Sequence, residues 1–137
     1  MTRNRGASFL THPRLVVGHA DGQYVDSLCR YFRRRGWHAH SAATGHEVRR
    51  LTAELAPSLI ILGTELADES GWLTCDKLLK RHSSQKVILV ADYWTPENRR
   101  FASFVGAAAV VHREAGFQAL AEEIDGPAAL LTVASAD

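Results

Sequence analysis

The stretch Pro57-Ser58-Leu59-Ile60-Ile61-Leu62-Gly63 decides how this chain folds. Four consecutive Leu and Ile residues follow a proline and end at a glycine, a pattern typical of a short strand that is buried on both faces. Such a strand belongs to a parallel sheet whose two sides are covered by helices. The stretch therefore predicts a central strand of an α/β domain, and the strand ends at Gly63, a position without a side chain.

Four more short apolar runs flank this stretch and predict further strands. They are Leu15–Gly18, Trp37–Ala42, Val87–Val90 and Ala108–Val111. Because the runs alternate with helical patterns, they predict a parallel sheet joined by right-handed crossovers and covered by helices on both faces.

Helix signals fill the gaps between the predicted strands. Asp21 is the expected N-cap of the first helix, Gly36 follows its end, and Thr44 or Gly45 opens the second helix. A third helix is expected over 70–81, and Thr95-Pro96-Glu97 reads as an N-cap with proline at the first helical position. The apolar positions of the first, fourth and fifth helices recur with helical spacing; they are Tyr24, Val25, Leu28, Cys29, Tyr31, Phe32, Phe101, Phe104, Val105, Phe117, Leu120, Ala121 and Ile124.

Length and composition fit one domain of an ordinary globular protein. The chain has 137 residues, 46% hydrophobic and 23% charged, with a net charge of +1. The balanced charge gives no general argument for a nucleic-acid or membrane partner, and no apolar run approaches the ~20 residues of a membrane span. We expect residues 13–125 to form the domain, 1–12 to be a disordered arm, and 126–137 to be a tail or a truncated linker.

Two cysteines, Cys29 and Cys75, fall in predicted helices without metal-ligand spacing. They are interpreted as small buried thiols in a reducing cytoplasm. The N-terminus lacks the apolar segment of a signal peptide, and a cytoplasmic location is expected.

Several landmarks occur in an order and spacing shared with one family. They are Leu15-Val16-Val17, Gly36 before an aromatic residue, Ala56-Pro57-Ser58, Gly71, Lys86-Val87-Ile88-Leu89 and Gly106-Ala107. Through them, residues 14–124 resemble the receiver domain of response regulators, the phospho-acceptor module of bacterial two-component signalling. The resemblance implies a doubly wound, flavodoxin-like sheet of five parallel strands in the order 2-1-3-4-5.

The resemblance also implies a site at the carboxyl ends of the strands. In the family, an acidic pair after the first strand binds Mg²⁺, an Asp ending the third strand accepts the phosphoryl group, and a hydroxyl and a Lys end the fourth and fifth strands. The acidic pair corresponds here to His19 with Ala20, or to Gly18 with His19 if the first helix is one residue longer. The other corresponding positions are Gly63, Ala91 and Arg113. The Mg²⁺ ligands, the nucleophile and the hydroxyl are therefore missing, as is the aromatic residue of the fifth strand, where Val110 stands.

Neighbouring residues offer only weak substitutes for this machinery. Asp21 is the nearest carboxylate to the acidic pair, and capping the helix is its favoured role. Glu65 and Asp92 are the other candidate oxygen ligands, and His19 and His112 would suit a transition metal. We interpret all of these as ordinary polar loop residues, so neither a metal nor a cofactor is expected, and no enzyme activity.

These residues predict an atypical receiver domain that cannot accept phosphate and acts as a phosphorylation-independent interaction module. Its partner is expected to be a signalling protein, with self-association through the fourth-helix face as one form. The candidate surface combines aromatic and cationic residues, which are enriched at interfaces; it comprises Tyr93, Trp94, Arg99, Arg100 and His112. Local packing of Tyr93 and Trp94, with Phe101 and Phe104 in the core, stays open as the alternative.

Two other functions stay in view. Arg113 is expected to point into the former phospho-acceptor pocket, which would also suit a domain that senses a small anion or metabolite there. Arginines cluster at Arg30, Arg33–Arg35 and Arg49–Arg50, but the chain offers no winged helix or helix-turn-helix for base readout, so a nucleic-acid partner is not expected.

Overall fold

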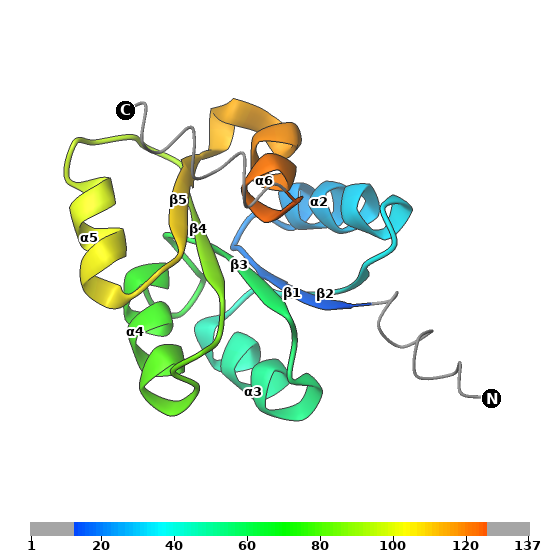
Figure 1. Ribbon diagram of the computed structural model, residues 1–137, viewed down its shortest axis with the longest axis horizontal. Helices are drawn as coiled ribbons and strands as arrows, with labels where there is room; N and C mark the ends of the chain where they lie inside the picture. The colour runs from blue at the N-terminus through cyan, green and yellow to red at the C-terminus, as the bar shows by residue number, and fades with distance from the viewer. Residues whose placement is uncertain (1–12, 126–137) are drawn as a thin grey trace.

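The computed structural model describes residues 13–125; the predicted arm and tail lie outside the described residues (Figure 1). Strands and helices alternate along this part of the chain, with one short 3₁₀ helix, η1. In chain order the elements are β1 (Arg14–Gly18), α2 (Gly22–Arg34), β2 (His38–Ala42), α3 (Gly45–Leu55), β3 (Leu59–Gly63), α4 (Gly71–Arg81), β4 (Val87–Ala91), α5 (Asn98–Val105), β5 (Ala109–His112), η1 (Arg113–Ala115) and α6 (Gly116–Asp125).

The five strands form one sheet in the order β2-β1-β3-β4-β5, and every neighbouring pair is parallel. Helices α2 and α6 cover one face of the sheet, and α3, α4 and α5 cover the other (Figure 1). The predicted doubly wound, flavodoxin-like topology is confirmed. The element order follows from the alternation of buried apolar runs with helical periodicity.

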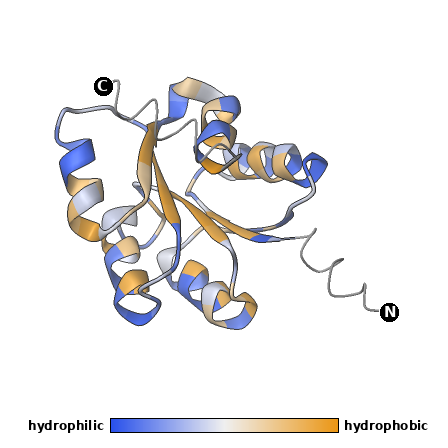
Figure 2. Ribbon diagram, viewed as in Figure 1, coloured by the Kyte–Doolittle hydropathy of each residue, from blue (hydrophilic) through white to orange (hydrophobic). Residues whose placement is uncertain are grey.

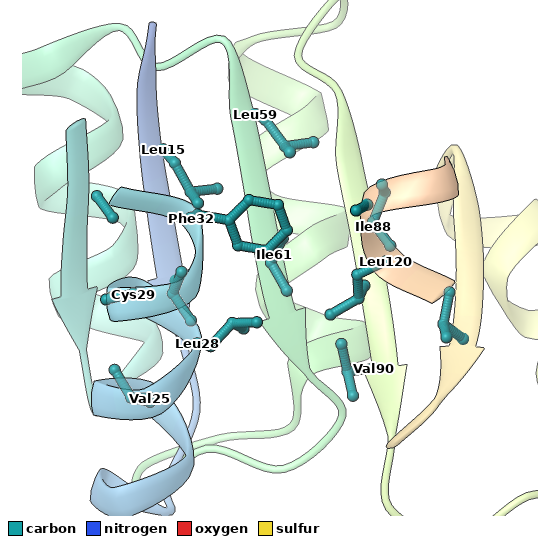
Figure 3. Close-up of a cluster of buried hydrophobic side chains, with 14 residues drawn as sticks. Leu15, Val25, Leu28, Cys29, Phe32, Leu59, Ile61, Ile88, Val90 and Leu120 are labelled. Carbon is teal, nitrogen blue, oxygen red and sulfur yellow. The ribbon is translucent and has the colours of Figure 1, made fainter. Parts of the chain in front are cut away.

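Alternate residues of the central strands supply the cores on the two faces of the sheet. Leu15, Leu59 and Ile61 pack under α2 and α6 together with Phe32 and Leu120 (Figure 3). The residues between them point to the other face, so all of β3 and β4 is buried, and the strands carry the strongest hydropathy in the fold (Figure 2). Burying one such side chain stabilises the fold by about 1.5–3 kcal/mol, before chain entropy is subtracted.

Three of the helices begin with a polar side chain that caps the backbone. The Asp21 carboxylate accepts from the N–H groups of Gln23 and Tyr24 at the start of α2, as predicted. Thr44 caps α3 and Ser70 caps α4 in the same way. These caps satisfy N–H groups that a helix leaves without partners in its first turn.

The start of α5 differs from the prediction. Thr95-Pro96-Glu97 forms a turn, and the helix begins at Asn98 without a side-chain cap on its N-cap residue. Asn98 is buried, its N–H donates to the Thr95 carbonyl, and its side-chain amide donates to the Tyr93 carbonyl. These local hydrogen bonds of Asn98 hold residues 95–97 in a turn, so the helix begins after the proline that marks its start in the sequence.

A second correction concerns the apolar residues of α5. The alternative that placed Phe101 and Phe104 in the core is wrong, because their exposed fractions are 50% and 87%. The helix turns Ala102 toward the sheet instead, where it is 4% exposed. The small alanine lets α5 lie close to the sheet and leaves both phenylalanines on the outer side.

Candidate functional site

The candidate site lies where β1, β3, β4 and β5 end, because parallel strands bring their carboxyl ends to one edge of the sheet. Strand pairing sets Gly18 beside Leu62, Gly63 beside Val90, and Ala91 beside His112. The residues that follow these ends, His19, Asp92 and Arg113, therefore meet above Gly63. Two other predicted site residues do not join this group: Ala20 is exposed, and Ala91 is buried within β4.

His19 occupies the space in which a side chain at position 63 would lie. A Cβ atom added to Gly63 would be 2.5 Å from Cδ2 of His19 and 3.1 Å from its Nε2, whereas real Cβ atoms hardly ever come closer than about 3 Å to another atom. The imidazole is only 4% exposed. The buried ring of His19, which follows the neighbouring strand β1, thus fills the space that a side chain at position 63 would occupy.

Two hydrogen-bond partners fix the orientation of the His19 ring. Its Nδ1 accepts from the backbone N–H of Asp21 at 3.0 Å, and its Nε2 lies 3.3 Å from Oδ1 of Asp92. Because Nδ1 accepts, the proton of the neutral ring belongs on Nε2, where it points toward the carboxylate. The ring also lies against Tyr24, with 4.8 Å between the ring centroids.

Arg113 completes the cluster from the end of β5. Its Nη2 lies 2.7 Å from Oδ2 of Asp21, and its Nη1 lies 3.5 Å from Oδ1 of Asp92. Its guanidinium also stacks on Tyr24, with Cζ 4.3 Å from the ring centroid. Arg113 therefore joins the segments that follow β1 and β4 to the end of β5.

The charges of the cluster shift the pKa values of its members. The hydrogen bond from Arg113, followed by those from the capped backbone, holds the pKa of Asp21 below its usual value. The same hydrogen bond raises the pKa of Arg113. Burial raises the pKa of Tyr24 to about 12, outweighing the nearby guanidinium, so the ring stays neutral. The guanidinium of Arg113 thus lies between the carboxyl groups of Asp21 and Asp92.

The donor set does not suit the Mg²⁺ ion of phospho-accepting receivers. Mg²⁺ requires several oxygen ligands in near-octahedral geometry. Asp21 and Asp92 are the carboxylates of the cluster, and the guanidinium of Arg113 already contacts both of them. Within residues 13–125, no three His, Cys, Asp or Glu residues are arranged to hold a metal ion.

The remaining sequence candidates lie apart from this cluster. Glu65 is exposed and pairs in a short bridge with Ser70. The rings of His112 and Trp94 are 6.0 Å apart between centroids. The guanidinium of Arg99 lies over the Trp94 ring, with Cζ 5.9 Å from its centroid. Tyr93 is 78% exposed and Trp94 is 41% exposed. The predicted surface residues thus gather around the start of α5 and the end of β5.

Two cavities lie away from the cluster. One, of about 430 Å³, is lined by Pro57, Ser58 and Lys86, at the amino ends of β3 and β4. The other, of about 420 Å³, lies between α3 and α4 near Arg49 and Arg81. Neither cavity includes a residue of the cluster.

Sequence reasoning missed the parts that Asp92 and Tyr24 play. The sequence offers Asp92 as a candidate metal ligand and favours an ordinary polar loop residue, yet Asp92 accepts from both His19 and Arg113. Tyr24 was counted as an apolar position of the first helix, yet it forms the wall on which Arg113 stacks. One usable signal was Asp92 directly after the apolar strand Val87–Ala91, since a carboxylate at a strand end faces the same edge as Gly63.

Close approach of the backbone also shapes this edge. The carbonyl of Gly63 lies against Gly71, the first residue of α4, where a Cβ atom would overlap it. The N–H of Gly71 donates to the carbonyl of Thr64 at 2.8 Å. Glycine at position 71 therefore allows α4 to start directly over the end of β3.

Within the described part of the chain, no helix is long and apolar enough to cross a membrane. No protein-family model matches the sequence, and none of the curated proteins matches it.

Solved structures do match the fold. A response regulator from Burkholderia pseudomallei, solved with a phosphorylated aspartic acid, a calcium ion and citrate, has a TM-score of 0.80 at 17% identity, over 90% of this chain and 73% of that chain. A CheY-like receiver domain from Methanospirillum hungatei has a TM-score of 0.77 at 25% identity, over 82% and 90%. A DNA-binding response regulator of the LuxR family from Staphylococcus aureus has a TM-score of 0.76 at 21% identity, over 82% and 96%. The chain has the receiver-domain fold of two-component response regulators.

Proposed function

We propose that this chain is an atypical receiver domain that accepts no phosphate and acts in signal transduction as a protein-interaction module. The observation that carries the proposal is the pairing of Gly63 with the buried ring of His19. Phosphoryl transfer needs a nucleophile at this place, together with a metal ion and a cation to offset the charge of the transferring group. A glycine covered by an imidazole supplies no nucleophile.

The contacts of Arg113 support the same conclusion. In phospho-accepting receivers a lysine ends the fifth strand, and here a cation at the corresponding place is bound to Asp21 and Asp92. Both carboxylates belong to the protein itself, so the positive charge is compensated without a phosphoryl group. The strand ends are held together by fixed interactions in place of a reversible modification.

The anion-sensing alternative receives less support from these contacts. A small anion at the site would have to compete with Asp21 for Nη2 of Arg113, at 2.7 Å. It would also approach two carboxylates, which costs Coulombic energy. We therefore favour a protein partner in a cytoplasmic signalling pathway, with no catalytic activity of the domain.

Acetyl phosphate with Mg²⁺ tests the proposal. The purified chain is incubated with both, and its intact mass is measured beside that of a receiver domain that keeps its acceptor Asp. The expected result is a phosphoryl adduct on the reference domain and none on this chain. An adduct that maps to an Asp or Glu within residues 13–125 would show that the proposal is wrong.

A further inference from the structure

Large exposed apolar side chains are confined to one region of the described chain. In residues 13–125 they belong to α4, to α5 and to the loop before α5. Their exposed fractions are 44% for Leu73, 78% for Tyr93, 41% for Trp94, 50% for Phe101 and 87% for Phe104. Contiguous exposed apolar surface marks interaction sites, whereas single apolar residues scattered over a surface do not.

Three of these exposed side chains, together with the half-buried Trp72, lie on the neighbouring helices α4 and α5. We call Trp72, Leu73, Phe101 and Phe104 the α4–α5 face. The rings of Trp72 and Phe101 meet edge-on with 5.6 Å between centroids, which bridges the two helices. Leu73 follows Trp72 in α4, and Phe104 stands about one turn after Phe101 in α5. Both helices lie on the same side of the sheet (Figure 1).

Cations outnumber carboxylates on the segments that carry the α4–α5 face. Helices α4 and α5 and residues 93–97 carry five cations (Lys77, Lys80, Arg81, Arg99 and Arg100) and two carboxylates, Asp76 and Glu97. Lys77 is ion-paired with Glu69 at 3.1 Å, and Lys77 and Arg81 line the cavity on the α3 side of α4. Asp76 is paired with Lys80 at 3.0 Å. Arg100 is exposed and stands four residues before Phe104, so it borders the most exposed ring of the surface.

We propose that the α4–α5 face binds an amphipathic helix of a partner protein, with apolar side chains at helical spacing and acidic residues along both flanks. The inference rests on the proposed function, for which it names the docking surface and the partner class. A helix laid along two neighbouring helices presents anchors at positions i, i+3, i+4 and i+7. The apolar anchors would cover Phe101 and Phe104, and the acidic flanks would meet Arg100 and Lys80.

Charge also selects against a second copy of this chain. A twofold contact places the same patch of both subunits face to face. The cations that border Phe104 in one copy would then lie against those of the other, and like charges across an interface oppose association. An acidic partner has the complementary charge and experiences no such repulsion.

The direct test is a fluorescence-anisotropy titration of the full chain with a labelled synthetic peptide. The peptide carries leucines at i, i+3, i+4 and i+7 and glutamates on both flanks. Two control peptides replace either the glutamates by lysines or the leucines by serines. We expect saturable binding of the first peptide alone, with affinity that falls as salt is raised, because the flanking contacts are screened.

Variants of the chain locate the binding site. Phe104→Ala should weaken binding about tenfold or more, the effect of losing an interface anchor. Its high exposure means that the substitution leaves the core unchanged. Arg100→Glu should also weaken binding. The matched control Arg30→Glu should not, because Arg30 is exposed on α2, which covers the opposite face of the sheet.

Each other outcome overturns the inference. If the chain binds the acidic peptide no more tightly than the lysine control, the proposed charge complementarity is wrong. If Phe104→Ala and the unchanged chain bind the peptide with equal affinity, the α4–α5 face is not the binding site. Concentration-dependent dimerisation that Phe104→Ala abolishes would assign the surface to a second copy. Because these readouts use no phosphoryl donor, failure here leaves the acetyl phosphate result intact, and an adduct with acetyl phosphate leaves the peptide result intact.

Discussion

The fit between His19 and Gly63 can be tested by adding a single methyl group. In Gly63→Ala the new Cβ would lie 2.5 Å from Cδ2 of His19, so the ring would have to move. The ring is held by the Asp21 N–H and by Asp92, and moving it strains or breaks both hydrogen bonds. We therefore expect the substitution to destabilise the fold, although alanine normally suits a strand better than glycine.

The expected size follows from three opposing contributions. Forcing a methyl group into a filled site costs about 1–3 kcal/mol. Weakening the hydrogen bonds of a buried ring adds about 1 kcal/mol. Replacing a strand glycine by alanine returns about 0.5–1 kcal/mol. The free energy of unfolding should therefore fall by about 2 kcal/mol.

Urea unfolding followed by circular dichroism measures this change, and a double-mutant cycle assigns its cause. If the clash with His19 is responsible, Gly63→Ala should cost about 1–2 kcal/mol less in a His19→Ala background than alone. Gly22→Ala is the matched control, because a Cβ atom at position 22 meets nothing within 4 Å. Strictly additive effects at positions 19 and 63 would refute the reasoning.

Two further predictions concern titratable groups. Because the pKa of Asp21 is lowered in the folded state, its carboxylate stabilises the fold above the pKa of the unfolded chain, and this contribution disappears as the pH falls through the folded value. Asp21→Asn, which keeps a capping side chain, should therefore show a shallower loss of stability in acid; equal acid profiles in urea unfolding would contradict the Arg113 pairing. Burial raises the pKa of Cys29 and raises that of Cys75 to about 12, so both thiols should resist Ellman's reagent at pH 8 until the chain unfolds. Rapid labelling of either thiol in the absence of denaturant would contradict their burial.

Most of the fold was predictable because its signals are local. The apolar runs of β3 and β4 required burial on both faces, and the structure buries both strands completely. Asp21 was recognised as the N-cap of α2 from its place before a periodic apolar segment. The start of α5 differs from the Thr-Pro signal because Asn98 donates hydrogen bonds to the carbonyls of Tyr93 and Thr95, which that signal does not reveal.

The location of the site was predictable, but its full membership and its arrangement were not. The resemblance to receiver domains implied positions 19, 63, 91 and 113, and parallel strands deliver such positions to one edge of the sheet. The packing of His19 over Gly63 depends on side-chain directions across two strands, which spacing alone does not give. Likewise, the exposure of Phe101 and Phe104 depends on which side of α5 meets the sheet, and the helical period leaves that choice open.

A backbone amide NMR titration with Mg²⁺ and beryllofluoride tests the central claim most directly. Beryllofluoride mimics an acyl phosphate, and a receiver domain with an intact acceptor Asp serves as the positive control. With His19 over Gly63 and Arg113 bound to Asp21 and Asp92, the account predicts no saturable shifts at residues 19–21, 63–65 and 91–92. Saturable shifts clustered at these residues would show a working anion or metal pocket and would contradict the account.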